Sequence, residues 1–104
     1  MPTELFDIAR AERETLRWVL LLALWYARPV GTSEYVMLRT AQDASLRVTP
    51  DMVRQELNYL RGRNLVKVND KEALWHAEIT PDGEDVVDYR ADAPAGIARP
   101  KKWV

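Results

Sequence analysis

The segment from residue 47 to residue 67 combines side chains that recognise nucleic acids. Gln55 and Asn58 carry amides that can hydrogen bond to adenine edges, while arginine pairs with guanine or with phosphate. Tyr59 can donate a hydrogen bond to a phosphate oxygen. The candidate DNA-contacting residues are Arg47, Thr49, Arg54, Gln55, Asn58, Tyr59, Arg61, Arg63 and Lys67. Residues 47–71 hold six basic and three acidic side chains, so the segment is locally basic.

A helix over residues 49–62 would present these side chains on one face. Thr49 supplies an N-cap hydroxyl and Pro50 suits the first turn. The apolar residues fall at i, i+4 and i+7 and predict a buried face: Val53, Leu57 and Leu60. Because each residue turns the helix by about 100°, the polar residues that point outward are Asp51, Gln55 and Asn58. Arg54 and Arg61 flank this face on one side, and Tyr59 on the other.

Two features weaken the case for DNA. Asp51 lies at the helix end that would enter a groove, where its carboxylate repels phosphate, although it also stabilises the helix N-terminus. The predicted hairpin tip, NDKEA at residues 69–73, balances its charges. Two functions therefore stay open. One is DNA binding, and the alternative is a protein-interaction module on the same fold that touches no DNA.

Other kinds of site find little support. The chain has no cysteine and one histidine, which argues against a thiolate or transition-metal site. His76 is expected on the outer face of a strand. Its spacing does not place it beside Ser33 or Ser45 and a carboxylate, as nucleophilic catalysis would need. The four glycines form no phosphate-binding loop. We expect a protein that is no enzyme and that uses no cofactor or metal.

The composition is that of a single small domain. A chain of 104 residues with 47% hydrophobic content can bury one core. The net charge of -1 excludes a uniformly basic DNA coat, so any nucleic-acid surface must be local. The N-terminus lacks a signal-peptide pattern, and the apolar run of residues 18–27 is short of the roughly 20 residues of a bilayer span. We expect a cytoplasmic protein without membrane contact.

The rest of the chain predicts further helices and a hairpin. Helices are expected over residues 5–28 and 34–43 and again after Thr80, with strands over 65–68 and 73–80. The second strand alternates and turns three residues inward: Trp75, Ala77 and Ile79. Asn64 tolerates the left-handed conformation of the corner before the first strand.

This order resembles the winged-helix family. The resemblance is carried by VTPDMVRQELNYLRGRNLVKV (48–68), the hairpin and ITPDGEDV (79–86), and covers about residues 16–90. It implies a mainly α fold with a long N-terminal helix, a helix-turn-helix, a two-stranded wing and a C-terminal helix. The layout, ending in GIARPKK, also resembles small winged-helix proteins of Mu-like phages and prophages. That likeness implies a phage protein, in the leading hypothesis a transcriptional regulator.

The first helix is apolar all round and should therefore be buried all round. The face opposite the core carries Trp18, Leu21, Leu22 and Trp25. We predict a homodimer through this face, which would pair two third helices on double-stranded DNA. The alternative is that the fourth helix, or the tail with Ile97 and Trp103, covers this face within one chain.

The tail has the composition of an extended arm. We assign residues 1–91 to the winged-helix domain and residues 92–104 to the arm. Its cations are Arg99, Lys101 and Lys102. They can follow a phosphate backbone or simply solubilise the chain. The last two residues are apolar and predict docking on the domain or on a partner: Trp103 and Val104.

Overall fold

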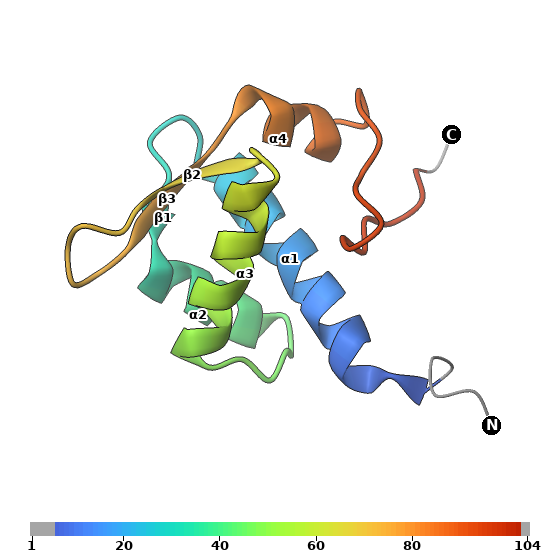
Figure 1. Cartoon of the computed structure of the whole chain (residues 1–104), viewed down its shortest axis with the longest axis horizontal. Helices are drawn as coiled ribbons and strands as arrows, with labels where there is room; N and C mark the ends of the chain where they lie inside the picture. The colour runs from blue at the N-terminus through green and yellow to red at the C-terminus, as the bar shows by residue number, and fades with distance from the viewer. Residues whose placement is uncertain (1–5, 103–104) are drawn as a thin grey trace.

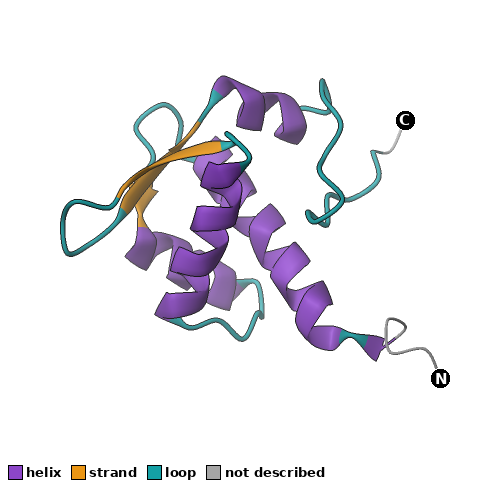
Figure 2. Cartoon of the chain, in the orientation of Figure 1, coloured by secondary structure: helices purple, strands orange, loops and turns teal. Residues whose placement is uncertain are grey.

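The computed structural model describes residues 6–102 and shows a mainly helical protein with one small sheet (Figure 1, Figure 2). The helices of this part are α1 (Ile8–Tyr26), α2 (Glu34–Asp43), α3 (Pro50–Gly62) and α4 (Pro81–Val87). Its strands are β1 (Thr32–Ser33), β2 (Val66–Asn69) and β3 (His76–Ile79). The predicted fold class, mainly α with a small β part, is confirmed.

Side-chain caps set the helix starts that the sequence predicts. The hydroxyl of Thr49 accepts a hydrogen bond from the N–H of Met52 at 3.3 Å, so α3 begins where its cap and proline indicate. Ser33 and Thr80 cap α2 and α4 in the same way. The bounds of α2 match the prediction, because a strong cap and a buried face act on the same residues.

α1 is shorter than the predicted helix over residues 5–28. Asp7 caps its start by accepting a hydrogen bond from the N–H of Arg10 at 3.0 Å; Leu5 lies outside the described residues. After Tyr26 the chain turns toward β1. Gly31 has a φ of 81°, and a Cβ there would collide with the carbonyl of Ala77, so only glycine fits this turn.

The sheet has the strand order β1–β3–β2 and is antiparallel. β2 and β3 form the predicted hairpin, in which Val68 lies opposite Ala77. β3 begins at His76, later than predicted. The sequence does not predict β1, because two residues are too few to show a period; Thr32 pairs with Ala77 at the other edge of β3. The predicted left-handed corner is confirmed, since Asn64 has a φ of 61°.

The core lies between the helices and the sheet. The predicted inner face of α3 is fully buried: Val53, Leu57 and Leu60. α1 contributes Leu16, Leu20, Leu21 and Leu24, and α2 contributes Met37 and Ala41. Burial of each large side chain stabilises the fold by about 1.5–3 kcal/mol. This packing holds α3 against α1 and α2 and leaves its other face outward.

The predicted dimer face of α1 is partly covered within one chain. Leu21 is fully buried in the core, so its assignment to a dimer interface is wrong. The other residues of this face are partly buried against the core: Trp18, Leu22 and Trp25. The physical reason is that α1 contacts α2, α3, β3 and α4, so one chain already removes most of the apolar circumference of α1 from water.

The tail packs on α1. Ile97 is 5% exposed, and the N–H of Ala98 donates a hydrogen bond to the carbonyl of Glu14 at 3.1 Å. Arg17 donates from Nη1 to the carbonyl of Gly96 at 2.9 Å. The described part of the arm, residues 92–102, has no helix or strand, and a buried side chain and these bonds attach it to the domain. Trp103 and Val104, whose docking the sequence leaves open, lie outside the described residues.

The apolar run of residues 18–27 contributes its leucines to the core. Within residues 6–102 the structure has no helix that is both long and apolar enough to cross a membrane. The side chains of Leu20 and Leu24 are instead fully buried inside the domain.

Candidate nucleic-acid interface

α3 keeps its polar face uncovered. Asp51, Gln55 and Asn58 are all exposed, which confirms the angular prediction. In Figure 1 α3 lies in front of α1 and α2, with the β2–β3 hairpin on one side and the tail on the other. The major groove of DNA is about 12 Å wide and admits one α-helix. An exposed helix face of this kind is therefore available to a partner.

Arg54 is hydrogen bonded to other parts of the fold, although its side chain is 38% exposed. Its Nε and Nη2 donate to the two carboxylate oxygens of Glu34 at 2.6 and 2.7 Å, and Nη2 also donates to the carbonyl of Ala73 at 2.8 Å. Glu34 further accepts a hydrogen bond from the N–H of Trp75 at 2.5 Å. These bonds hold the pKa of the Glu34 carboxyl below its ordinary value, chiefly through Arg54. The geometry gives Arg54 a structural role, in which it joins α3 to Glu34 of α2 and to the hairpin, and its contact with DNA stays a prediction.

Arg61 and Asn58 bind one another. Nη2 of Arg61 donates to Oδ1 of Asn58, and Nη1 donates to Oδ2 of Asp70 in the hairpin at 3.1 Å. Reading adenine with two bonds would need both the oxygen and the nitrogen of the Asn58 amide. Arg61 uses one of the two lone pairs of this oxygen, so Asn58 offers a partner the second lone pair and its N–H groups.

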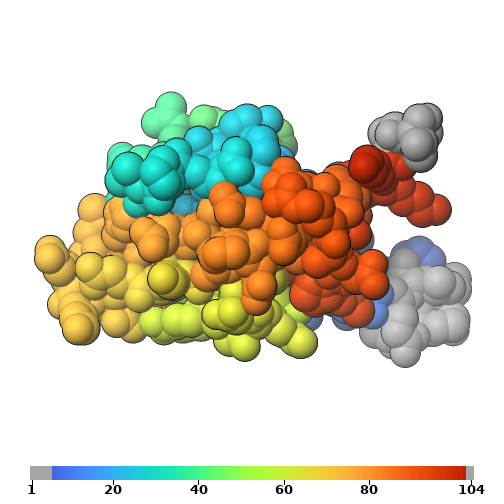
Figure 3. Space-filling model, turned by 90° about the horizontal axis from the view of Figure 1, so that it is seen from above, coloured from blue at the N-terminus to red at the C-terminus, as the bar shows by residue number. Residues whose placement is uncertain are grey.

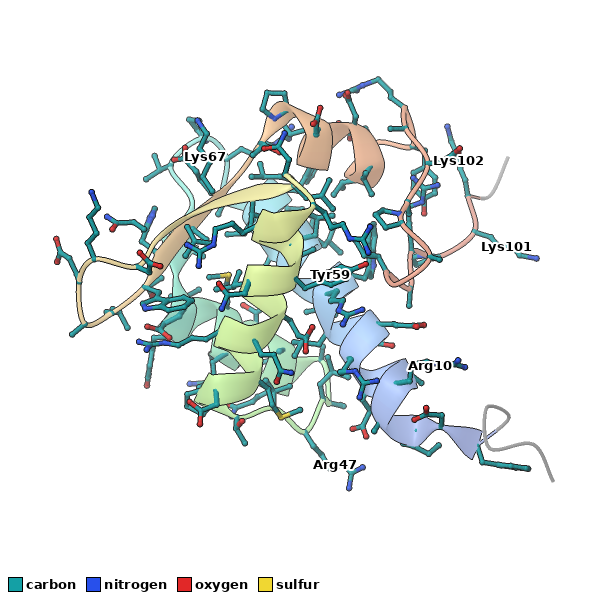
Figure 4. All side chains as sticks on the ribbon, viewed as in Figure 1. Arg10, Arg47, Tyr59, Lys67, Lys101 and Lys102 are labelled. Carbon is teal, nitrogen blue, oxygen red and sulfur yellow. The ribbon has the colours of Figure 1, made fainter. Side chains whose placement is uncertain are left out.

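Tyr59 points away from the polar face and toward α1 (Figure 4). Its hydroxyl is buried and has no hydrogen-bond partner among the described residues. The Arg17 guanidinium lies 3.7 Å from the centre of its ring, and a Cβ at Gly96 would lie only 2.5 Å from its oxygen. The predicted phosphate contact by Tyr59 is wrong, because the tail and α1 cover the hydroxyl.

Two predicted cations remain exposed where α3 passes into β2. Arg63 follows the last residue of α3, with its guanidinium 5.1 Å from the centre of the Tyr59 ring. Lys67 extends outward from β2 in Figure 4. Neither cation forms an ion pair with a carboxylate in the described part of the chain. They suit phosphate contacts, which need charge and reach but no base-specific geometry.

The segment before α3 contributes the other predicted contacts. Arg47 points away from the body of the protein in Figure 4, and its side chain is 83% exposed. Nη2 lies 3.1 Å from Oε1 of Glu12. An exposed ion pair of this kind contributes about 0–1 kcal/mol, so a phosphate can compete with Glu12. Thr49 caps α3, and its hydroxyl hydrogen stays available to a partner.

One of the three acidic side chains in residues 47–71, that of Glu56, is buried next to this face. The side chain of Glu56 is 3% exposed and lies 2.7 Å from Nε of Arg17, whose side chain is 16% exposed. Glu56 therefore neutralises a cation of α1 and adds no charge to the surface. The spacing of Glu56 indicates this burial, since residue 56 falls at i+3 from Val53, inside the apolar stripe of α3.

The structure also brings Ser33 and His76 together. They are cross-strand partners of β1 and β3. The Ser33 hydroxyl accepts the N–H of Val36, and within residues 6–102 no hydrogen bond joins it to the imidazole. The same residues hold no group of three or more His, Asp or Glu side chains arranged to bind a metal ion. This pair therefore does not form a nucleophile with an oriented base.

The site thus consists of an exposed helix face with paired arginines on the hairpin side and, at the α3–β2 corner, two cations that have no ion pair within residues 6–102. Its function has to be inferred from these side chains. No family model matches the chain, and no significant match was found among curated proteins or solved structures.

Proposed function

We propose that the protein is a winged-helix protein that binds double-stranded DNA through α3. The observation that carries this proposal is the exposed polar face of α3, with an exposed cation before it, Arg47, and two after it, Arg63 and Lys67. The order of three helices and a hairpin supports the winged-helix assignment. The sequence resemblance to small phage and prophage proteins implies a phage protein, and transcription regulation is the role that we propose for its DNA binding.

The contacts divide by position along α3. Arg63 and Lys67 bind backbone phosphates, which supplies most of the affinity. Gln55 has an exposed amide and reads a base edge. Asp51 carries the opposite charge, so the first turn of α3 stays away from phosphates. Affinity in this arrangement rests on few cations and is therefore expected to be moderate.

A salt titration of binding to mixed-sequence duplex DNA tests the proposal. The logarithm of the binding constant should fall linearly with the logarithm of salt concentration, by about 0.9 for each phosphate contacted. Arg63→Ala with Lys67→Ala should reduce this slope by about 2. The matched control is Arg39→Ala with Arg90→Ala, which removes two exposed arginines from ion pairs outside α3. Absence of binding at low salt contradicts the proposal.

Sequence reading is tested separately. Selection of bound sequences from a random duplex pool should return a preferred site for the wild-type protein. Gln55→Ala should lose the preference at one base pair while keeping the salt slope, because the side chain carries no charge. A variant whose selected sequences match those of the wild type would show that Gln55 does not contact a base.

A protein-interaction module is the second candidate. It is favoured by exposed apolar side chains beside the N-terminal end of α3, where Tyr35 is 66% and Leu74 is 54% exposed. DNA-contacting surfaces are polar and basic, so such side chains are not needed there. In this case the protein has no affinity for duplex DNA at low salt, and the Arg63 and Lys67 substitutions leave its partner binding unchanged.

A further inference from the structure

A groove beside the start of α3 combines apolar walls with an acidic rim. It has a volume of about 260 Å³ and lies between α2, α3 and the loop that joins β2 to β3. Its lining residues are Glu34, Tyr35, Leu38, Pro50, Asp51, Arg54, Ala73 and Leu74. The exposed side chains of Tyr35 and Leu74 leave much of these walls in water. Apolar surface gathered in a concave site indicates an interaction site.

The charge of the groove favours a cationic occupant. Two carboxylates and one guanidinium line it, so the lining has a net charge of −1. The Glu34 carboxylate is already bound by Arg54 and by the N–H of Trp75. Asp51 is the exposed carboxylate of the groove, and Glu72 is exposed in the adjoining loop. A fitting occupant therefore carries a large apolar side chain next to a cation.

The C-terminal segment of the chain has this chemistry. Lys101 and Lys102 are exposed, and neither forms an ion pair with a carboxylate of residues 6–102. They precede Trp103 and Val104, which lie outside the described residues. Two cations are thus followed by a large aromatic and an aliphatic side chain.

The segment does not reach the groove of its own chain. Tyr89 donates from its hydroxyl to the carbonyl of Pro100 at 2.5 Å, which attaches the tail beside α4. The hairpin and the tail lie at opposite ends of the molecule in two perpendicular views (Figure 1, Figure 3). Two residues extend at most about 7 Å, whereas the longest dimension of the protein is 45 Å. The groove of a second copy is accessible without this constraint.

We propose that residues 101–104 of one copy bind the groove of a second copy. Trp103 enters between Tyr35 and Leu74, and Lys102 faces Asp51. Groove and tail are different surfaces, so the contact is heterologous and adds copies head to tail. It does not rest on DNA binding, and it uses other surfaces than the dimer predicted through α1.

Sedimentation equilibrium of the full chain tests this contact. The average mass should rise with concentration and fall with added salt, since part of the attraction is electrostatic. Leu74→Asp and Trp103→Ala should each remain monomeric. Mixed together they retain one intact groove and one intact tail, so they should form a dimer that grows no further. The matched control is Val30→Asp, at a residue 71% exposed outside the groove, which should associate like the wild type.

A disulfide trap identifies the contacting segments. Because the chain has no cysteine, single substitutions are unambiguous. Mixing Ala73→Cys with Val104→Cys should give a cross-linked pair, and Val30→Cys with Val104→Cys should not, since a disulfide needs Cα atoms within about 7 Å. A monomeric wild type at all concentrations overturns the proposal. Equal cross-linking of the control overturns it, as does association that depends on Leu74 but not on Trp103.

Discussion

Two groups of cations lie on α3 or next to it and differ in whether a carboxylate neutralises their charge. Arg17 and Arg54 each bond to a carboxylate at 2.7 Å or less, and these carboxylates, on Glu56 and Glu34, are nearly buried. Arg63 and Lys67 lie at the corner after α3 and form no ion pair within residues 6–102. All four are cations of one small domain, yet the first two hold the fold together while the second pair is available to a partner. The burial of the neighbouring acid decides the role.

The Arg17–Glu56 and Arg54–Glu34 ion pairs also differ from one another in burial. The side chains of Arg17 and Glu56 are 16% and 3% exposed, whereas those of Arg54 and Glu34 are 38% and 9% exposed. Removal of one partner from a buried pair leaves an uncompensated charge, and water reaches the Arg54 side more easily. We therefore expect the largest loss of stability when the Arg17–Glu56 pair, which lies beneath the tail, is broken.

Glu56→Ala should lower the free energy of unfolding by about 3 kcal/mol, because Arg17 then stays near the core without its carboxylate. Urea denaturation followed by circular dichroism measures the loss. The double variant Arg17→Met with Glu56→Leu should recover most of it, since apolar residues of similar volume replace a buried pair at little cost. A double variant as unstable as Glu56→Ala would mean that the pair itself, and not the stranded charge, stabilises the fold.

Glu34→Gln should lower the free energy of unfolding by about 2 kcal/mol at neutral pH, since the cluster on Arg54 and the Trp75 N–H loses its charged acceptor. The pH dependence separates this effect from simple loss of packing. Arg54 lowers the pKa of Glu34 below its ordinary value of 4.5 in the folded protein, so the wild type gains stability from this group above that value.

As pH falls from 4.5 through the lowered pKa of Glu34, this stability is lost. The difference in unfolding free energy between the wild type and Glu34→Gln should therefore be constant near neutral pH and shrink below 4.5. Urea titrations at a series of pH values measure it. A difference that stays constant down to the acid transition would show that the charge of Glu34 does not stabilise the hairpin.

The two groups of cations show which parts of this molecule follow from its sequence. The bounds of α2 and α3 were predictable because local caps at Ser33 and Thr49 and a periodic apolar stripe specify them. The role of Arg54 was not predictable from the sequence, because Glu34 is distant in sequence and contacts Arg54 only after α2 packs on α3. Tyr59 was misplaced for a similar reason, since its hydroxyl is covered by a tail whose composition indicates no packing.

Gly96→Ala should lower the free energy of unfolding by about 1 kcal/mol. The added Cβ would lie 2.5 Å from the Tyr59 hydroxyl and 2.8 Å from Nη1 of Arg17, both ends of side chains that can shift. Its clearer effect should be on the tail, where hydrogen exchange at the N–H of Ala98 should speed up. Gly62→Ala is the matched control, because a Cβ at Gly62 meets nothing within 4 Å. Equal exchange in both variants would contradict tight docking at Gly96.

Arg63→Ala with Lys67→Ala should have the smallest effect on stability, within about 0.5 kcal/mol, because no buried group depends on either cation. A DNA-binding assay of the same variant separates the role of these cations in binding from any role in stability. Affinity for duplex DNA should fall while urea denaturation is unchanged. For Glu34→Gln, in contrast, urea denaturation should show a loss of stability. A marked loss of stability would show instead that the α3–β2 corner needs these cations, and the distinction between the two groups would then disappear.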